Sequence, residues 1–322
     1  MSGSKYNSLQ GKLQPTQETT GSSGHRDNPT LGIASFIGNL LLMSLISAAV
    51  RALSRDYPLV EILLFRYLAA MLFFWAILFS FTGIRGLATR RPFDHVFRSV
   101  SGIISLGLLY YAIASIPIAD ATAIAYAAPI FITVFSIFLL HETIGMQRWI
   151  AVIAGFIGVL LIAQPGNEGW HPGVVAAIGS AFTGALVAIW LRKLSSSEKS
   201  VTIGTFYNSL GALVCLVLVL SSDWTIPRSD DLVLIFVFGI MCGIQQWWLT
   251  ISFRYAEASL LAPFEYLAMI FAAIVGYVFW GEIPVLTTWL GAAVIAGSGL
   301  FIFMRRQKRA KSTDNVEPAI IE

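Results

Sequence analysis

Ten apolar segments follow one another along the chain, and they restrict what it can fold into more than any other feature. A helix rises about 1.5 Å per residue, so about 20 residues cross the hydrocarbon of a bilayer. Helices also satisfy all their backbone hydrogen bonds within one segment, as lipid requires. The sequence predicts an all-α integral membrane protein with ten transmembrane helices, at residues 31–53, 58–81, 96–114, 119–140, 146–163, 170–191, 200–221, 230–252, 258–280 and 285–304.

Composition excludes an ordinary soluble domain, because 56% of the residues are hydrophobic and only 12% are charged, against about a quarter charged in soluble proteins. The two cysteines, Cys215 and Cys242, both lie in apolar segments, so they indicate no disulfide framework. The four histidines are dispersed and lack the spacing of metal ligands. We therefore expect no metal and no cofactor.

Lysine and arginine positions predict the orientation, because cytoplasmic segments carry an excess of both. With the amino terminus inside, 17 of the 21 Lys and Arg residues fall on the cytoplasmic side, Arg98 among them. Only Arg51, Arg55 and Arg228 fall outside, and Arg66 lies within a span. Both termini are therefore expected in the cytoplasm. Residues 1–30 and 305–322 are predicted as cytoplasmic tails, the first of them disordered and polar.

The chain also contains an internal duplication. Residues 108–142 resemble 245–282: at a shift of 137 positions Tyr110-Tyr111 meets Trp247-Trp248, and at 140 Glu142 meets Glu282. We interpret 31–163 and 170–304 as two repeats of five spans. Because five is odd, the repeats enter the membrane from opposite sides, which is the inverted architecture of alternating-access transporters. A duplicated bundle without a transport role is the alternative.

Several motifs resemble the EamA family of the drug/metabolite transporter superfamily, over about residues 31–304. They are Phe65-Arg66-Tyr67, Ile116-Pro117-Ile118-Ala119-Asp120, Ala128-Pro129, Leu140-His141-Glu142, Arg148-Trp149, Gln164-Pro165-Gly166, Ala262-Pro263-Phe264-Glu265-Tyr266 and Gly281-Glu282-Ile283-Pro284. The resemblance implies a ten-span carrier with a 5+5 inverted repeat. It also implies a central cavity lined mainly by spans 1, 3, 4, 6, 8 and 9. The pattern is somewhat like members that take up S-adenosylmethionine or riboflavin, and amino-acid exporters fit it as well.

Two charged residues are predicted at lipid depth, where an ionised side chain must face protein or water. Arg66 lies about 12 Å below the predicted outer face and Glu265 about 10 Å from the inner one. Arg66 could anchor a substrate carboxylate or phosphate, or be a structural cation paired with Glu61 or with helix carbonyls. Glu265 could bind a substrate ammonium or exchange a proton, or form a fixed hydrogen bond with Tyr207 or Asn208.

Polar and aromatic residues of other spans complete the predicted substrate site. Gln245, Gln246 and Trp248 form a cluster deep in span eight, although helical geometry lets only part of such a cluster face a cavity. Weaker candidates, for which core packing is the default, are Asn39 and Tyr126, and Tyr266 adjoins Glu265. Pro129 and Pro263 are predicted to interrupt spans four and nine as hinges or helix breaks. Glu142 and Glu282 are interpreted as solvated end residues or helix caps rather than gates.

These observations favour a secondary transporter of a small polar or zwitterionic metabolite in a bacterial inner membrane, with proton coupling at Glu265 as one option. An exporter of aromatic or cationic compounds, and a membrane receptor or scaffold without flux, are the alternatives. An enzyme is not expected, because no catalytic cluster and no phosphate-binding glycine loop is found. The expected partners are a small-molecule substrate and membrane lipids, not nucleic acid, and the oligomeric state stays open.

Overall fold

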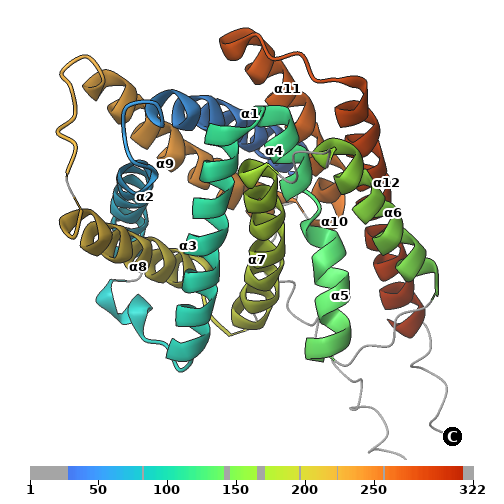
Figure 1. Cartoon of the computed structure of the whole chain (residues 1–322). Coiled ribbons are helices and arrows are strands. Elements are labelled where there is room, and N and C mark those ends of the chain that lie inside the picture. Colours follow the sequence, from blue (N-terminus) through green and yellow to red (C-terminus); the bar gives the residue numbers. More distant parts are fainter. Residues whose placement is uncertain are drawn as a thin grey trace, which may run out of the picture.

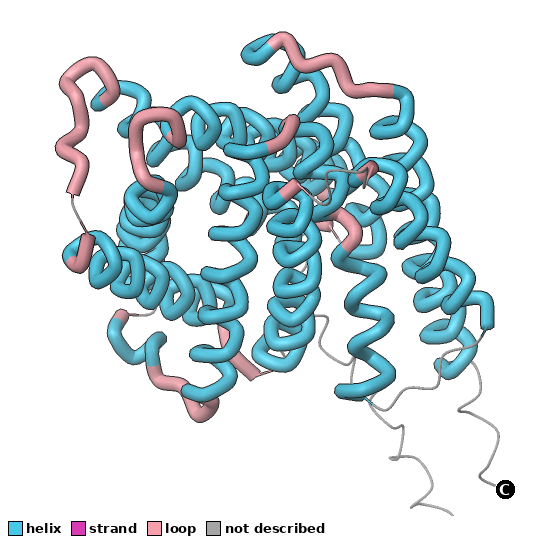
Figure 2. Tube along the Cα trace, in the orientation of Figure 1, coloured by secondary structure: helices cyan, strands magenta, loops and turns pink. Residues whose placement is uncertain are grey.

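Helices make up all the regular structure in the part of the chain that the computed structural model describes, residues 28–81, 83–140, 146–164, 171–195, 197–222, 224–256 and 258–314 (Figure 2). Eight helices are long and apolar enough to cross a membrane, and two shorter apolar helical segments accompany them. The prediction of an all-α membrane protein with ten spans is confirmed. The elements are α1 (Pro29–Leu53), α2 (Leu59–Phe81), η1 (Ile84–Leu87), α3 (Pro92–Ser115), α4 (Ile118–Ala125), α5 (Ala128–Leu140), α6 (Met146–Ala163), α7 (Pro172–Ser195), α8 (Ser200–Leu220), α9 (Leu232–Tyr255), α10 (Ala258–Leu261), η2 (Ala262–Tyr266), α11 (Leu267–Trp280) and α12 (Leu286–Asp314).

Two helix boundaries differ from the predicted ones in ways that matter. The helix α3 begins at Pro92 rather than at residue 96, since proline suits the first helical turn and Asp94 carries a favourable charge there. The helix α12 continues to Asp314, ten residues past the predicted span, because its polar end is rich in helix-forming Arg, Lys and Ala. Residues 1–27 and 315–322 of the two predicted tails lie outside the described residues.

Spans four and nine are each broken closer to their amino-terminal end than to their carboxyl-terminal end. The first break is a turn at Tyr126 and Ala127 between α4 and α5, and Pro129 is the second residue of α5. The second break is the 3-10 segment η2, which contains Pro263 and separates α10 from α11. Proline has no backbone N–H to donate, so a helix readily ends or tightens beside it. Each half of the chain therefore has one interrupted span at a corresponding place.

The pairing of helices follows the duplication. The four most extensive contacts are α3 with α7, α1 with α9, α6 with α12 and α2 with α8, and Figure 1 shows α3 beside α7 at the centre and α6 beside α12 at one edge. Exchanging the halves replaces α1 by α7, α2 by α8, α3 by α9 and α6 by α12. Under this exchange the α3–α7 contact becomes the α9–α1 contact, and the other two pairs map onto themselves. The two halves are therefore arranged symmetrically.

Contacts at the helix ends show that the two halves run in opposite senses. The Arg51 side chain, at the end of α1, donates a hydrogen bond to the carbonyl of Ile116, just past α3. Gly173, at the start of α7, packs against Ser115 and Ile116. The first helix of one half therefore ends on the side where the first helix of the other half begins. We call this side the Arg51 face and the opposite side, where Lys193 pairs with Asp94, the Lys193 face.

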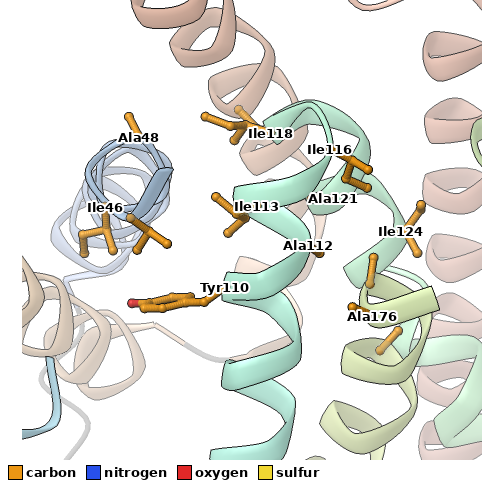
Figure 3. Close-up of a cluster of buried hydrophobic side chains, with 14 of the residues drawn as sticks. Ile46, Ala48, Tyr110, Ala112, Ile113, Ile116, Ile118, Ala121, Ile124 and Ala176 are labelled. Carbon is orange, nitrogen blue, oxygen red and sulfur yellow. The ribbon is translucent and has the colours of Figure 1, made fainter. Parts of the chain in front are cut away.

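A continuous apolar core joins the halves. Figure 3 shows Ile46 and Ala48 of α1 near Ile113 of α3, with Tyr110 extending away from α3. One close approach lies between α6 and α12, where a Cβ added at Gly158 would lie 2.8 Å from the Gly291 carbonyl oxygen, and one at Gly291 would lie 2.6 Å from that of Gly158. Small residues permit such backbone contact between membrane helices.

Candidate functional site

Arg66 lies on α2 at the junction with α3, α8 and α9. Its guanidinium carbon is 6.0 Å from the ring of Tyr67 and 5.9 Å from the ring of Tyr110, and the thiol of Cys242 also lies against it. The Nε and Nη1 atoms are buried and have no hydrogen-bond partner in the described part of the chain. A guanidinium in such surroundings is strongly attractive to an anion, because little else offsets its charge.

The structural pairing predicted for Arg66 with Glu61 does not form. One oxygen of Glu61 accepts a hydrogen bond of 2.8 Å from the backbone N–H of Thr225, and the other is buried and has no partner among the described residues. Glu61 therefore joins α2 to the segment before α9. Of the two interpretations of Arg66, the geometry disfavours the one that depends on this carboxylate.

A second buried arginine, Arg98 on α3, was not predicted as a site residue. Its guanidinium carbon lies 3.9 Å from the centre of the Tyr207 ring, and its Nε and Nη1 atoms have no hydrogen-bond partner in the described ranges. The hydroxyl groups of Tyr207 and Tyr67 are 3.1 Å apart. Because the span was predicted to begin at residue 96, Arg98 was expected at the cytoplasmic end of the helix. Pro92 at the true helix start was the signal that would have placed it inside.

Helices α1 and α9 meet through a buried amide pair. The Nε2 atom of Gln245 donates to Oδ1 of Asn39 over 2.7 Å, and Gln245 Oε1 has no partner among the described atoms. The half-buried ring of Trp248 lies against Gly38, where a Cβ would come within 2.6 Å of it. Both contacts therefore join the first half to the second. Gln246 is also half-buried.

Trp247 lies next to α2 and not at the α1–α9 contact. It is 40% exposed, packs edge-on against Phe73, and lines a groove of about 750 Å³ between α2 and α9. Every side chain in this groove is apolar or glycine, and several are exposed, such as Leu72 and Phe236. Because its lining is apolar and exposed, we expect this groove to face lipid. It contains none of the predicted site residues.

The two helix breaks face each other. The rings of Tyr126, at the end of α4, and Tyr266, at the end of η2, are 6.4 Å apart. Glu265 precedes Tyr266, its charge lies close to both tyrosines, and its side chain is exposed although η2 lies within a span. Its predicted partners are engaged elsewhere, Tyr207 with Tyr67 and Asn208 with the Gly204 carbonyl. Within the described residues Glu265 has no ion-pair partner.

The predicted site residues therefore fall into three groups. Arg66 belongs to an arginine–tyrosine cluster of α2, α3 and α8. Asn39, Gln245 and Trp248 lie at the α1–α9 contact. Glu265, Tyr126 and Tyr266 lie at the facing helix breaks, next to the segments that contain Pro129 and Pro263. Within the described residues, no hydrogen bond or ion pair joins Arg66 to Glu265.

A polar cluster at the Arg51 face joins α1, α4, α12 and the segment after α11. Arg51 forms an ion pair with Glu282, and the other oxygen of Glu282 accepts a hydrogen bond of 3.0 Å from the N–H of Ile118. Nearby, Thr288 donates to Asp120 over 2.8 Å. Glu282 was interpreted as a solvated end residue or a cap. It does cap α4, but it is also half-buried in an ion pair that connects α1, α4 and α11. Its counterpart Glu142 lies outside the described residues.

Comparison with known proteins identifies the class. An S-adenosylmethionine uptake transporter of Rickettsia felis is 27% identical over 277 residues, covering 86% of this chain and 94% of that protein. A riboflavin transporter of Vibrio cholerae is 30% identical over 237 residues, covering 73% and 79%. A pseudopaline exporter of Pseudomonas aeruginosa is 29% identical over 258 residues, covering 78% and 88%.

The fold has a counterpart among solved structures. One crystal structure of a protein superposes with a TM-score of 0.60 at 18% identity, covering 84% of this chain and 96% of the other.

The sequence profile of the EamA-like transporter family matches residues 30–164 and 171–304, one match in each half. The molecule is thus a multi-pass membrane transporter of small molecules, and the chain belongs to the EamA-like transporter family.

Proposed function

We propose that this protein is a secondary transporter that moves a small polar or zwitterionic metabolite by alternating access between its two inverted halves. The observation that carries the proposal is the placement of charge. Arg66, a cation that has no counterion among the described residues, lies in the first half, and an accessible carboxylate, Glu265, lies at the helix break of the second. Charges of opposite sign inside a membrane protein mark substrate or ion pathways.

The relatives support the substrate class. Their names include uptake of S-adenosylmethionine, transport of riboflavin and export of pseudopaline, so polar metabolites and both directions occur among similar proteins. A metabolite with a negative group for Arg66 and a positive group for Glu265 fits these side chains. Broken helices at corresponding places in the two halves also accompany midplane binding sites in transporters.

The proposed setting is a bacterial inner membrane, with the Lys193 face and both termini in the cytoplasm. Positive residues favour this orientation. Transport against a gradient would then need a second gradient, and an exposed carboxylate at lipid depth is suited to take up and release a proton. We assign this role to Glu265.

Purified protein reconstituted in liposomes tests the proposal. The panel contains S-adenosylmethionine, riboflavin and the common amino acids, with protein-free liposomes as the control. We expect saturable flux of at least one zwitterionic compound. Binding without flux would favour the receptor or scaffold alternative, and flux confined to compounds without an anionic group would contradict the proposed role of Arg66.

A further inference from the structure

Arg66 and Arg98 lie at similar depths from opposite faces. Arg66 is seven residues past the start of α2 at the Arg51 face, and Arg98 is six residues past the start of α3 at the Lys193 face. At 1.5 Å per residue each lies roughly 10 Å inside its own end of the bundle. Arg66 therefore lies closer to the Arg51 face, and Arg98 lies closer to the Lys193 face.

Within the described residues, neither arginine forms an ion pair with a carboxylate. The ion pairs among the described residues are Arg51 with Glu282, Lys193 with Asp94 and Arg228 with Asp56. Near the start of α3 the two acidic groups are engaged, Asp94 by Lys193 and Glu198 by Thr89. Unpaired buried charge is costly and is found where a ligand, water or ion can supply the missing partner.

A pair of tyrosines separates the two arginines. Ring contacts lead from Arg66 to Tyr67 at 6.0 Å, from Tyr67 to Tyr207 at 5.5 Å, and from Tyr207 to Arg98 at 3.9 Å. Gly102 packs against Tyr207 and Arg98: a Cβ added there would lie 2.7 Å from the Tyr207 ring and 3.1 Å from Arg98 Nη1. Both hydroxyl groups can donate to an anion when they are not bonded to each other.

We infer that Arg98 and Tyr207 form a second anion-binding site, toward the Lys193 face, and that the carboxylate or phosphate group of the substrate passes between Arg66 and Arg98 by way of the Tyr67–Tyr207 pair. This rests on the proposed function for the passage, whereas anion binding at Arg98 does not depend on transport. The substrate is therefore an anion or a zwitterion rather than a simple cation.

The first test measures anion binding without transport. Thermal unfolding of the full-length protein in detergent is followed with sodium acetate, sodium phosphate or neutral acetamide, at constant ionic strength set with chloride. We expect acetate or phosphate to raise the unfolding temperature of the wild type by roughly 2–4 °C. The rise should fall by about half in Arg66→Gln and in Arg98→Gln and vanish in the double variant. Whichever anion gives the larger rise identifies carboxylate or phosphate as the preferred group.

Arg51→Gln is the matched control, because it removes an arginine that is already paired. Its unfolding temperature should fall, but the anion-induced rise should equal that of the wild type. If Arg98→Gln keeps the whole anion-induced rise, the second site does not exist. If the acetamide rise equals the acetate rise, the effect is not one of charge and the inference is overturned.

The second test uses liposomes in which the protein has a single orientation and a substrate found by the flux panel. Arg98→Gln should raise the KM about tenfold or more for substrate added at the Lys193 face, and Arg66→Gln should do so at the Arg51 face. Arg98→Lys should recover part of the affinity. An equal effect of both variants from both sides would overturn the two-site passage. Anion-induced stabilisation without flux would instead leave Arg98 as a binding site and contradict the proposed function.

Discussion

Arg51 and Arg66 are both half-buried arginines in the first half of the chain, but their surroundings are opposite. Arg51 has Glu282 and the Ile116 carbonyl as partners, and the same carboxylate caps α4. Arg66 has aromatic rings and a thiol around it, and two of its nitrogens have no partner in the described chain. Contacts between helices therefore neutralise the charge of Arg51, and within the described residues they do not neutralise that of Arg66.

The comparison separates two uses of the same side chain. A paired arginine holds helices together, and its loss should lower stability. An unpaired buried arginine is a cost to the empty protein that a ligand can offset, so its loss should lower transport while leaving stability unchanged or improved.

The largest effect is expected for Arg66→Gln. Because a charged contact to the substrate in a poorly solvated site is lost, kcat/KM for an anionic or zwitterionic substrate should fall about 100-fold, equivalent to about 2.7 kcal/mol. Flux into liposomes measures this, and Arg66→Lys should restore part of it. A stability loss as large as the transport loss would show that Arg66 is a structural cation.

Next is Glu282→Gln, which leaves Arg51 without its ion-pair partner. The free energy of unfolding should fall by about 2 kcal/mol, less than for a fully buried pair because both side chains are partly exposed. Unfolding in mixed detergent with increasing dodecyl sulfate measures the change. The double variant with Arg51→Gln should lose less than the sum of the singles, and strict additivity would mean that the pair contributes nothing.

A smaller effect is expected for Glu265→Gln. The amide keeps the shape but cannot exchange a proton, so flux should fall about tenfold and lose its dependence on pH. Flux measured across mildly acidic to mildly basic pH tests this. An unchanged rate with an unchanged pH profile would assign Glu265 to structure. The neighbouring Tyr266→Phe is the control and should retain the pH dependence.

The smallest effect is expected for Arg228→Gln. This arginine pairs with Asp56 over 3.2 Å, but the two side chains are 72% and 45% exposed. Solvent and salt screen such a pair, so the unfolding free energy should change by less than about 0.5 kcal/mol and transport should not change. A loss comparable to that of Glu282→Gln would mean that burial does not distinguish the two ion pairs.

The fold could be predicted because lipid permits few choices. Segment length, the duplication and the odd number of spans per half together lead to ten helices in two inverted halves. The prolines also marked the helix breaks, since proline acts locally through its missing N–H. The predicted start of α3 was less accurate. Asp94 and His95 belong to the first turns of this helix, but they are polar, so the apolar pattern does not include them.

The site was only partly predictable. Arg66 and Glu265 stand out in sequence because charge is rare at lipid depth. Arg98 does not, since its depth depends on where α3 begins, and its contact with Tyr207 joins residues 109 positions apart. The pairing of Arg51 with Glu282 joins even more distant residues. Which charges have partners is a property of tertiary packing, and the sequence leaves that question open.

The contact between Gly158 and Gly291 has a mechanical consequence. At this contact each glycine lies against the carbonyl of the other and against an isoleucine side chain, Ile295 or Ile162, so we expect α6 and α12 to tilt or slide little against each other. We therefore expect movement of one half relative to the other to occur mainly in the remaining spans, with the α6–α12 contact as the pivot.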